Sequence, residues 1–380
     1  MHIFTYIDKD ATMYEKSKAL GVAPSEQKNQ NTGLDSILEI QKYKIDGNFY
    51  NSRVLIHFDM TALSSEITAG TITHATHSLI MYSANSYDIP LSYQIDAYPV
   101  AESWEMGTGK SNDLPIVQDG VSWKYRNGYL NGSGSHWSTA SFANVNGEYT
   151  ATGSTEMGGV YYKGHTGDTD KYTHIQSFNY EVEDLKINVT DSVNSMHSST
   201  ITNRGFILKR PDSQENDNAP YGNLQFFSRD THTIYIPRLE TKWDDSTWST
   251  GSLTELDMSS DIILYMKGIK PEYKNTAIEK FKVNGRNRIV AKTYSTSSDY
   301  LTVKYLPQTT YYSVRDVSTD EVLIDFSDCT KISCDSSGNF FNFRMSTLQP
   351  ERYYKFLFKV VSGSSTQIFD DNKFQFKVVR

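Results

Sequence analysis

Short segments in which apolar and polar side chains alternate recur along most of the chain. In residues 91–98 (LSYQIDAY), for example, Leu91, Tyr93, Ile95 and Ala97 fall on one side. A period of two residues is typical of a β-strand with one face against a core. Clusters of Asn, Asp, Gly, Ser and Pro separate these segments, as turns require. The pattern predicts an all-β chain of short strands, arranged as a sandwich or a jelly roll.

The alternating segments form two groups, which a polar, turn-rich stretch at about residues 242–260 separates. A chain of 380 residues is long enough for about two domains. We therefore expect an N-terminal jelly-roll sandwich over residues 1–245. A smaller, immunoglobulin-like β-sandwich should follow over residues 255–380.

A stretch rich in Gly, Ser, Asn and Thr, from about residue 104 to residue 173, interrupts the first group of strands. It carries several aromatic residues, among them Trp123, Tyr129 and Trp137. Long loops with aromatic anchors are often functional excursions from a rigid scaffold. We predict a loop insertion, and two roles for these three residues stay open. They form an exposed platform that contacts a partner or a glycan, or they pack the loop onto its own domain.

The sequence contains no motif of a known catalytic site. A G-x-S-x-G elbow, an H-E-x-x-H pair and a P-loop are all absent from it, and residues 107–111 resemble only the end of a P-loop. The nine histidines do not form a group with metal-ligand spacing. We expect a non-enzymatic protein with no catalytic residues, no resident cofactor and no transition-metal site.

Two loops rich in carboxylates and amides, at residues 164–170 and 212–218, offer the oxygen ligands that Ca²⁺ prefers. Their spacing differs from that of an EF-hand, so a structural calcium ion and simple solvated turns both stay open. Cys329 and Cys334 are five residues apart and fit one hairpin. A disulfide between them also stays open, while two thiols alone make no zinc site.

The charge balance, with 37 basic and 45 acidic residues and a net charge of −8, argues against nucleic acid as a partner. No segment approaches the roughly 20 consecutive apolar residues of a membrane helix. The first residues, MHIFTY, have neither the basic nor the apolar region of a secretory signal. We expect synthesis in a cytoplasm without ordinary secretion. The 26 tyrosines and 18 phenylalanines suit both strands and protein interfaces.

A series of segments in the first 245 residues resembles, in order, the DNRLRE-type jelly rolls, which are related in fold to carbohydrate-binding modules. The segments are residues 9–15 (KDATMYE), 31–35 (NTGLD), 38–40 (LEI), 52–59 (SRVLIHFD), 73–82 (THATHSLIMY), 182–190 (VEDLKINVT), 203–208 (NRGFIL) and 228–233 (SRDTHT). The resemblance implies a β-sandwich used for attachment, and it supplies no catalytic residues. Residues after Lys242 resemble no family that we can name.

The long insertion departs from the secreted members of that family. With residues 120–126 (GVSWKYR) and 237–240 (PRLE), it is similar to structural proteins of T-even-like marine myophages. The resemblance implies a component of a tailed-bacteriophage virion, in the neck, tail, baseplate or fibre attachment. It would contact other virion proteins and form a homo-oligomer in a symmetric assembly. The alternative is a glycan-binding attachment module for a host or cell surface, and a polysaccharide-degrading enzyme is the least favoured hypothesis.

Overall fold

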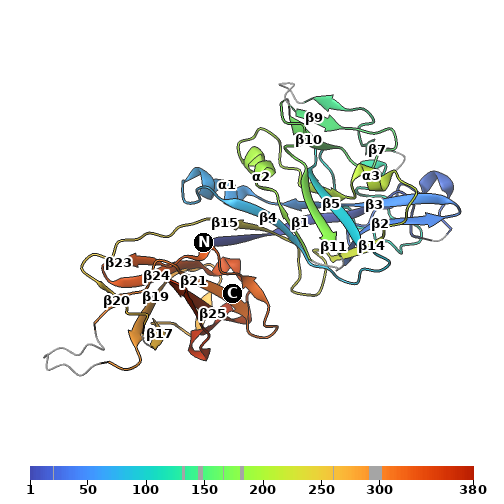
Figure 1. Ribbon diagram of the computed structural model, residues 1–380. Helices are drawn as coiled ribbons and strands as arrows, with labels where there is room; N and C mark the ends of the chain where they lie inside the picture. The colour runs from blue at the N-terminus through green and yellow to red at the C-terminus, as the bar shows by residue number, and fades with distance from the viewer. Residues whose placement is uncertain are drawn as a thin grey trace. The chain divides into compact units, whose positions relative to one another are not determined.

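The computed structural model of the chain describes residues 1–19, 21–130, 133–143, 149–165, 167–179, 184–259, 261–290 and 302–380. The fold is all-β, with 45% strand and 9% helix, so the fold class predicted from the alternation is confirmed. The chain divides into two compact units (Figure 1). Unit 1 consists of residues 1–4, 72–75 and 241–380, and unit 2 consists of residues 5–71 and 76–240.

The first residues of the chain belong to unit 1, although the sequence analysis placed them in the N-terminal domain. The Met1 ammonium group donates hydrogen bonds to the carbonyl oxygens of Trp243 and Cys329, and it forms an ion pair with Asp245 at 3.0 Å. A buried charge needs such partners. The unit boundary falls inside strand β1 (His2–Tyr14), where no turn residue marks it.

Unit 2 is built on a large, nearly closed sheet of ten strands. Its strands follow the order β11-β5-β13-β3-β1-β15-β4-β12, and β2 pairs with both β3 and β14. Beside β1 they are β2 (Ile37–Ile45), β3 (Asn48–Phe58), β4 (Thr76–Met81), β5 (Ser92–Pro99), β11 (His174–Asn179), β12 (Leu185–Asn188), β13 (Phe206–Lys209), β14 (Gly222–Phe227) and β15 (Arg238–Lys242). Three helices join them: α1 (Thr61–Thr68), α2 (Thr190–His197) and α3 (Asp212–Glu215). The jelly-roll connectivity stays a prediction.

The predicted loop insertion contains short strands of its own. They are β6 (Tyr125–Leu130), β7 (Ser133–His136), β8 (Phe142–Ala143), β9 (Tyr149–Thr152) and β10 (Tyr161–His165). β6 pairs with β7, and β10, β9 and β8 form a second small sheet. An isolated bridge between Val100 and Tyr161 fixes this second sheet beside the end of β5. The insertion is therefore a folded part of unit 2, not a free loop.

Unit 1 contains two main sheets that pack face to face. One has the order β17-β19-β24-β23, and the other β18-β27-β25-β21-β22 with β26 beside β25. Their strands are β17 (Ile262–Lys267), β18 (Glu272–Lys274), β19 (Ile278–Asn287), β21 (Thr310–Asp316), β22 (Val322–Ile324), β23 (Ser333–Asp335), β24 (Gly338–Arg344), β25 (Arg352–Ser362), β26 (Ser365–Phe369) and β27 (Gln375–Val379). β16 (Thr254–Glu255) and β20 (Lys304–Tyr305) form a separate short parallel sheet, and β20 contacts β19 and β24.

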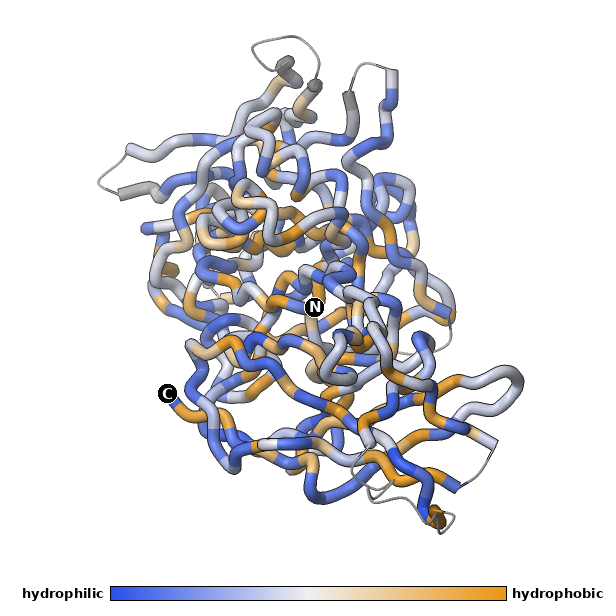
Figure 2. Tube along the Cα trace, turned by 90° about the vertical axis from the view of Figure 1, so that its left-hand side faces the viewer, coloured by the Kyte–Doolittle hydropathy of each residue, from blue (hydrophilic) through white to orange (hydrophobic). Residues whose placement is uncertain are grey.

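The core of unit 1 lies between the two sheets. Phe281 of β19 lies 5.0 Å from Phe356 of β25, and Phe341 of β24 lies 4.5 Å from Tyr312 of β21, measured between ring centroids. Contacts of this kind between sheets are those of a β-sandwich. Figure 2 shows hydrophobic and hydrophilic residues alternating along many strands, as a sheet with one buried face requires.

Candidate binding groove in unit 2

Two of the three aromatic residues that the sequence analysis nominated are buried. Trp123 is 2% exposed, its Nε1 donates to the carbonyl of Glu156 at 2.8 Å, and the Arg53 guanidinium lies 4.8 Å from its ring centroid. Trp137 is 1% exposed, and its Nε1 donates to the carbonyl of Ser122 at 3.0 Å. Both residues pack the insertion onto its own unit, so neither forms an exposed platform for sugars.

Tyr129, the third nominated residue, lies in β6. Its side chain lies outside the described part of the structure, so its role in an interface or a glycan site stays a prediction.

The carboxylates at the start of the 212–218 loop pair with cationic side chains. Asp212 accepts from Lys163 and Lys209, both at 2.5 Å. Glu215, which is 5% exposed at its side chain, binds Arg53 through two hydrogen bonds of 3.0 and 2.8 Å and lies 2.7 Å from Lys209. Although burial raises the pKa of Asp212, the nearby Lys209 and Lys163 hold it well below its usual range. The carboxylates of Asp212 and Glu215 are therefore the counter-charges of lysine and arginine side chains of unit 2.

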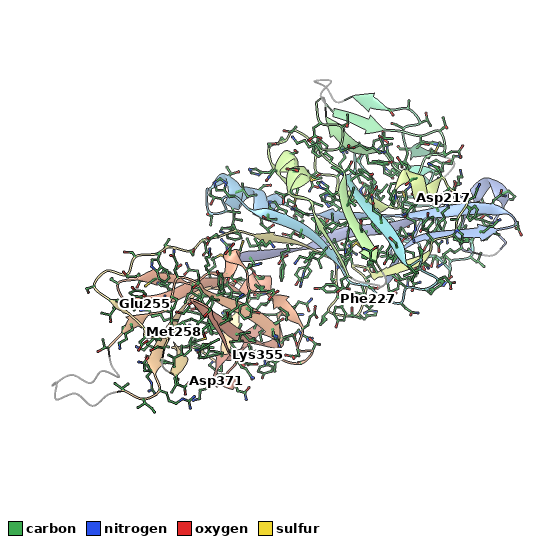
Figure 3. The ribbon with its side chains drawn as sticks, viewed as in Figure 1. Asp217, Phe227, Glu255, Met258, Lys355 and Asp371 are labelled. Atoms are coloured by element: carbon green, nitrogen blue, oxygen red, sulfur yellow. The ribbon has the colours of Figure 1, made fainter. Side chains whose placement is uncertain are left out.

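Asp217, later in the same loop, accepts from the ammonium group of Lys42 at 2.6 Å and from the hydroxyl of Tyr221. Burial raises the pKa of Asp217, but the hydrogen bonds from Lys42 and Tyr221 together outweigh it and lower the pKa to about 2. Figure 3 places Asp217 near α3 and the ends of β2 and β3. The carboxylates of this loop, which would have to bind a calcium ion, are thus paired with lysine and arginine side chains.

In the other predicted calcium loop, the side chains that the structure describes form no metal cluster. Asp168 and Asp170 are both exposed, and the Asp168 carboxylate accepts from the backbone N–H of Asp170 at 3.3 Å. Among the described residues, no three His, Cys, Asp or Glu side chains come together in a way that would hold a metal ion. Cys329 and Cys334 are free thiols.

A cleft of about 750 Å³ opens in unit 2 over β2 and β14. Four parts of the chain line it: the segment after β1, strand β2, Tyr87 with Asp88, and the start of β14. The register of the two strands places Gln41 opposite Asn223 and Glu39 opposite Gln225. Because opposite residues of an antiparallel pair project from the same face, these four polar side chains form one layer beneath the cleft.

Glu39 is the anchor of this polar layer. It is 4% exposed and accepts from four side chains: the Tyr14 hydroxyl, Lys18 Nζ at 2.6 Å, Asn223 Nδ2 at 2.9 Å and Gln225 Nε2 at 2.7 Å. Burial alone would raise the pKa of Glu39, but the hydrogen bonds from Lys18 and Tyr14 lower it below its usual value. The carboxylate is therefore ionised and its acceptor sites are filled. Its role is to fix the side chains around it.

Two side chains that line the cleft keep an unpaired polar atom. Gln41 is 5% exposed, and its Nε2 donor has no hydrogen-bond partner. Asn223 is 2% exposed; its Nδ2 donates to Glu39 and to the Tyr87 hydroxyl, while its Oδ1 acceptor has no partner. A buried polar group without a partner costs about 1–3 kcal/mol. One donor and one acceptor thus stand side by side at the cleft.

Tyrosines and lysines surround this pair of amides. The Tyr43 and Tyr50 rings lie 6.2 Å apart and are tilted by 42°, and Tyr87 is half exposed. Lys16 Nζ lies 4.7 Å from the centroid of the Tyr50 ring. Burial, and secondarily the charge of Glu39, raises the pKa of Tyr43 to about 12, so its hydroxyl stays protonated at neutral pH.

A second cavity of about 540 Å³ adjoins the first, and the two share Lys16 and Gln27 as lining residues. Lys28 and Lys124 line it as well. Lys28 forms an exposed ion pair with Glu156 at 3.1 Å, whereas Lys124 Nζ lies 5.3 Å from a tyrosine ring centroid. We call the two cavities together the β2–β14 groove.

The sequence analysis singled out none of the groove residues. In β2, Glu39 and Gln41 alternate with Leu38 and Ile40, a pattern that predicts a solvent-facing polar side. The structure instead covers that polar side, which leaves Glu39 and Gln41 buried. The alternation in the sequence shows that β2 has a polar face. It does not show whether that face is exposed to solvent or buried by other parts of the chain.

No protein-family model matches the chain, and no curated protein matches its sequence. Fold and site therefore define its class: an all-β protein of two units, with a polar groove in one of them. Within the described residues, no helix has the length and the hydrophobicity needed to cross a membrane.

Proposed function

We propose that the chain is a structural, non-enzymatic component of a tailed-bacteriophage virion, in its neck, tail, baseplate or fibre attachment, and that it acts through contacts with other virion proteins. The position of the family-like segments in the sheet supports this proposal. Residues 9–15, 52–59 and 203–208 lie largely in β1, β3 and β13, which are neighbours in the sheet. Segments that resemble one family in order along the chain thus also lie together in space.

An exposed apolar patch on unit 1 also supports a role in protein contacts. Val317 is 37% exposed, Val322 41% and Tyr353 54%. The Val317 N–H donates to the Tyr353 carbonyl at 3.0 Å, and Val322 lies opposite Arg315 on the neighbouring strand. The three side chains therefore come from one end of the same sheet. Apolar and aromatic side chains gathered in this way are typical of protein interfaces.

The proposal includes a location and an assembly state. The chain is made in the host cytoplasm and joins the particle there, in a closed, symmetric homo-oligomer or ring. Mass spectrometry of purified particles tests this. We expect the chain in the particles at a stoichiometry that matches a symmetric ring. A chain that is abundant in the lysate but absent from purified particles contradicts the proposal.

A further inference from the structure

We propose that the β2–β14 groove binds an extended, acidic peptide segment of a partner protein. The unpaired amide atoms of Gln41 and Asn223, the unpaired lysines of the groove and its two adjoining cavities all point to such an occupant. This inference names the kind of partner for the protein contacts proposed above, and in that respect it rests on the proposed function.

The two unpaired atoms complement a peptide group. Gln41 Nε2 offers a donor to a carbonyl oxygen, and Asn223 Oδ1 offers an acceptor to an N–H. The two residues are direct neighbours across β2 and β14, so their Cβ atoms lie about 5 Å apart. Both atoms are closed off from solvent in the free protein, so both side chains must rotate toward the cleft before a backbone amide pairs with them. The energy gained includes the cost that each unpaired atom carries in the free protein.

The lysines of the groove favour acidic side chains on that peptide. In the described residues, no carboxylate lies within ion-pair distance of Lys16 or Lys124, and each ammonium group lies over a tyrosine ring instead. The chain as a whole carries a net charge of −8. Six lysines and three carboxylates (Glu15, Asp88 and Glu156) line the groove, so its charge is opposite in sign to that of the whole chain. Glutamate or aspartate side chains would pair with these ammonium groups, which adds attraction at a distance and helps to fix the register.

A saccharide is the other occupant that a polar groove accepts, and the titration below separates it from a peptide. The two cavities adjoin, because both are lined by Lys16 and Gln27, and together they give an extended segment room beyond a single side chain.

Calorimetric titration of the full chain with an end-blocked peptide of alternating glutamate and threonine tests the inference. We expect binding that weakens as salt is added, because the lysines contribute through screened charges. A peptide with glutamine in place of glutamate should bind about tenfold more weakly. A version with methylated backbone nitrogens should also bind more weakly, since it has no N–H for Asn223.

Variants of the chain separate binding from folding. Gln41→Met should weaken peptide binding about tenfold without lowering the unfolding midpoint, because it removes a buried donor that has no partner in the free protein. The double variant Lys16→Ala with Lys124→Ala should lose a similar factor and most of the salt dependence. Lys267→Ala, at an exposed lysine of unit 1, is the matched control and should bind like the wild type.

Two results would overturn the inference. One is unchanged peptide affinity in Gln41→Met, and the other is binding of polygalacturonate without binding of the peptide. The proposed function is tested separately by the particle analysis. A chain found in particles that binds no peptide refutes this inference alone, and a chain absent from particles that binds the peptide refutes the virion proposal alone.

Discussion

The interiors of the two units differ in the charged side chains that they bury. In unit 1 an aromatic cluster fills the space between two sheets. Unit 2 also has a hydrophobic core, but it buries in addition lysine, arginine and carboxylate side chains that pair with one another. The two units should therefore respond differently to the loss of a single charge.

The aromatic cluster of unit 1 centres on Phe356, which is fully buried. Its ring lies 4.8 Å from Phe376, 5.0 Å from Phe281 and 5.1 Å from Phe341, between centroids. Edge-to-face and offset-stacked contacts of this kind add to the hydrophobic stabilisation of each ring. No charged group takes part in these contacts, so they are insensitive to pH and salt.

The charged interior of unit 2 depends on long-range partners. Arg53 and Glu215 lie 162 residues apart in the sequence, and Lys209, whose side chain is completely buried, bonds the same carboxylate. Removing Glu215 takes the counter-charge from Arg53 and leaves Lys209 with Asp212 alone, which costs more than an exposed pair contributes. Unit 2 should therefore be sensitive to the loss of single charges and to pH.

The largest expected effect is in unit 1. Phe356→Ala should lower its free energy of unfolding by about 4 kcal/mol, because the truncation leaves a cavity among rings that cannot collapse into it. Hydrogen exchange during denaturant unfolding, resolved by unit, measures this. Unit 2 should be unaffected. Tyr353→Ala, at an exposed position of the same strand, is the control, and an equal loss there would remove the distinction between core and surface.

The corresponding change in unit 2 is Glu215→Gln. It keeps the shape of the side chain but leaves Arg53 and Lys209 without their shared carboxylate, so unit 2 should lose about 3 kcal/mol. Glu156→Gln is the matched control, since its exposed pair with Lys28 should contribute less than about 1 kcal/mol. Equal losses in the two variants would show that burial does not decide the strength of these pairs.

The pH dependence of unit 2 provides a third comparison. Burial, opposed in part by a hydrogen bond from the Arg229 N–H and aided by the charge of Asp230, raises the pKa of Asp10 to about 7. Between about pH 4 and pH 7 the folded chain keeps a proton that the unfolded chain releases, so this group makes folding less favourable as pH rises. Asp10→Asn does not titrate and should therefore stabilise unit 2 by about 4 kcal/mol above pH 7, relative to pH 4.

Thermal unfolding of Asp10→Asn and of the wild type between pH 4 and pH 8 measures how the difference in their free energies of unfolding changes with pH. Asp320→Asn, at an exposed carboxylate of unit 1, should show no such pH-dependent gain. A gain for Asp10→Asn that is the same at pH 4 and at pH 8 would mean that the carboxyl group does not titrate in this range.

The smallest expected effect concerns the insertion. Trp137→Phe keeps an aromatic ring but removes the N–H that donates to Ser122, so unit 2 should lose about 1 kcal/mol. Trp248→Phe, in unit 1, is the control for loss of ring size. Chemical denaturation with fluorescence of the remaining tryptophans measures both, and no loss in Trp137→Phe would show that the indole hydrogen bond does not hold the insertion.

Much of the fold was predictable from local pattern. The alternation in residues 91–98 predicted a strand, and β5 covers residues 92–99 with Tyr93, Ile95 and Ala97 buried. Leu91 is the exception: it lies just before the strand and is 70% exposed. The alternation succeeds because side chains on a strand point to opposite faces whatever the rest of the chain does.

The site was not predictable in the same way. Trp123 and Trp137 stand in a Gly-rich segment that suggests an exposed loop, yet strands β6–β10 fold the insertion and bury both indoles. Glu39 and Gln41 suggest a solvated face, yet other parts of unit 2 cover them. Glu39 has partners 184 and 186 residues away, and the indoles bond to carbonyl groups 15 and 33 residues away, so neither burial follows from the local strand pattern.

By itself, then, the sequence determined the strands, their one-sided hydrophobic faces and the all-β class, because these follow from backbone geometry over a few residues. Only the tertiary structure decided which polar residues are buried, which atoms stay unpaired in the β2–β14 groove and to which unit Met1 belongs. Those features depend on contacts between residues more than 100 positions apart, such as Glu39 with Asn223 and Met1 with Trp243, which local sequence does not encode.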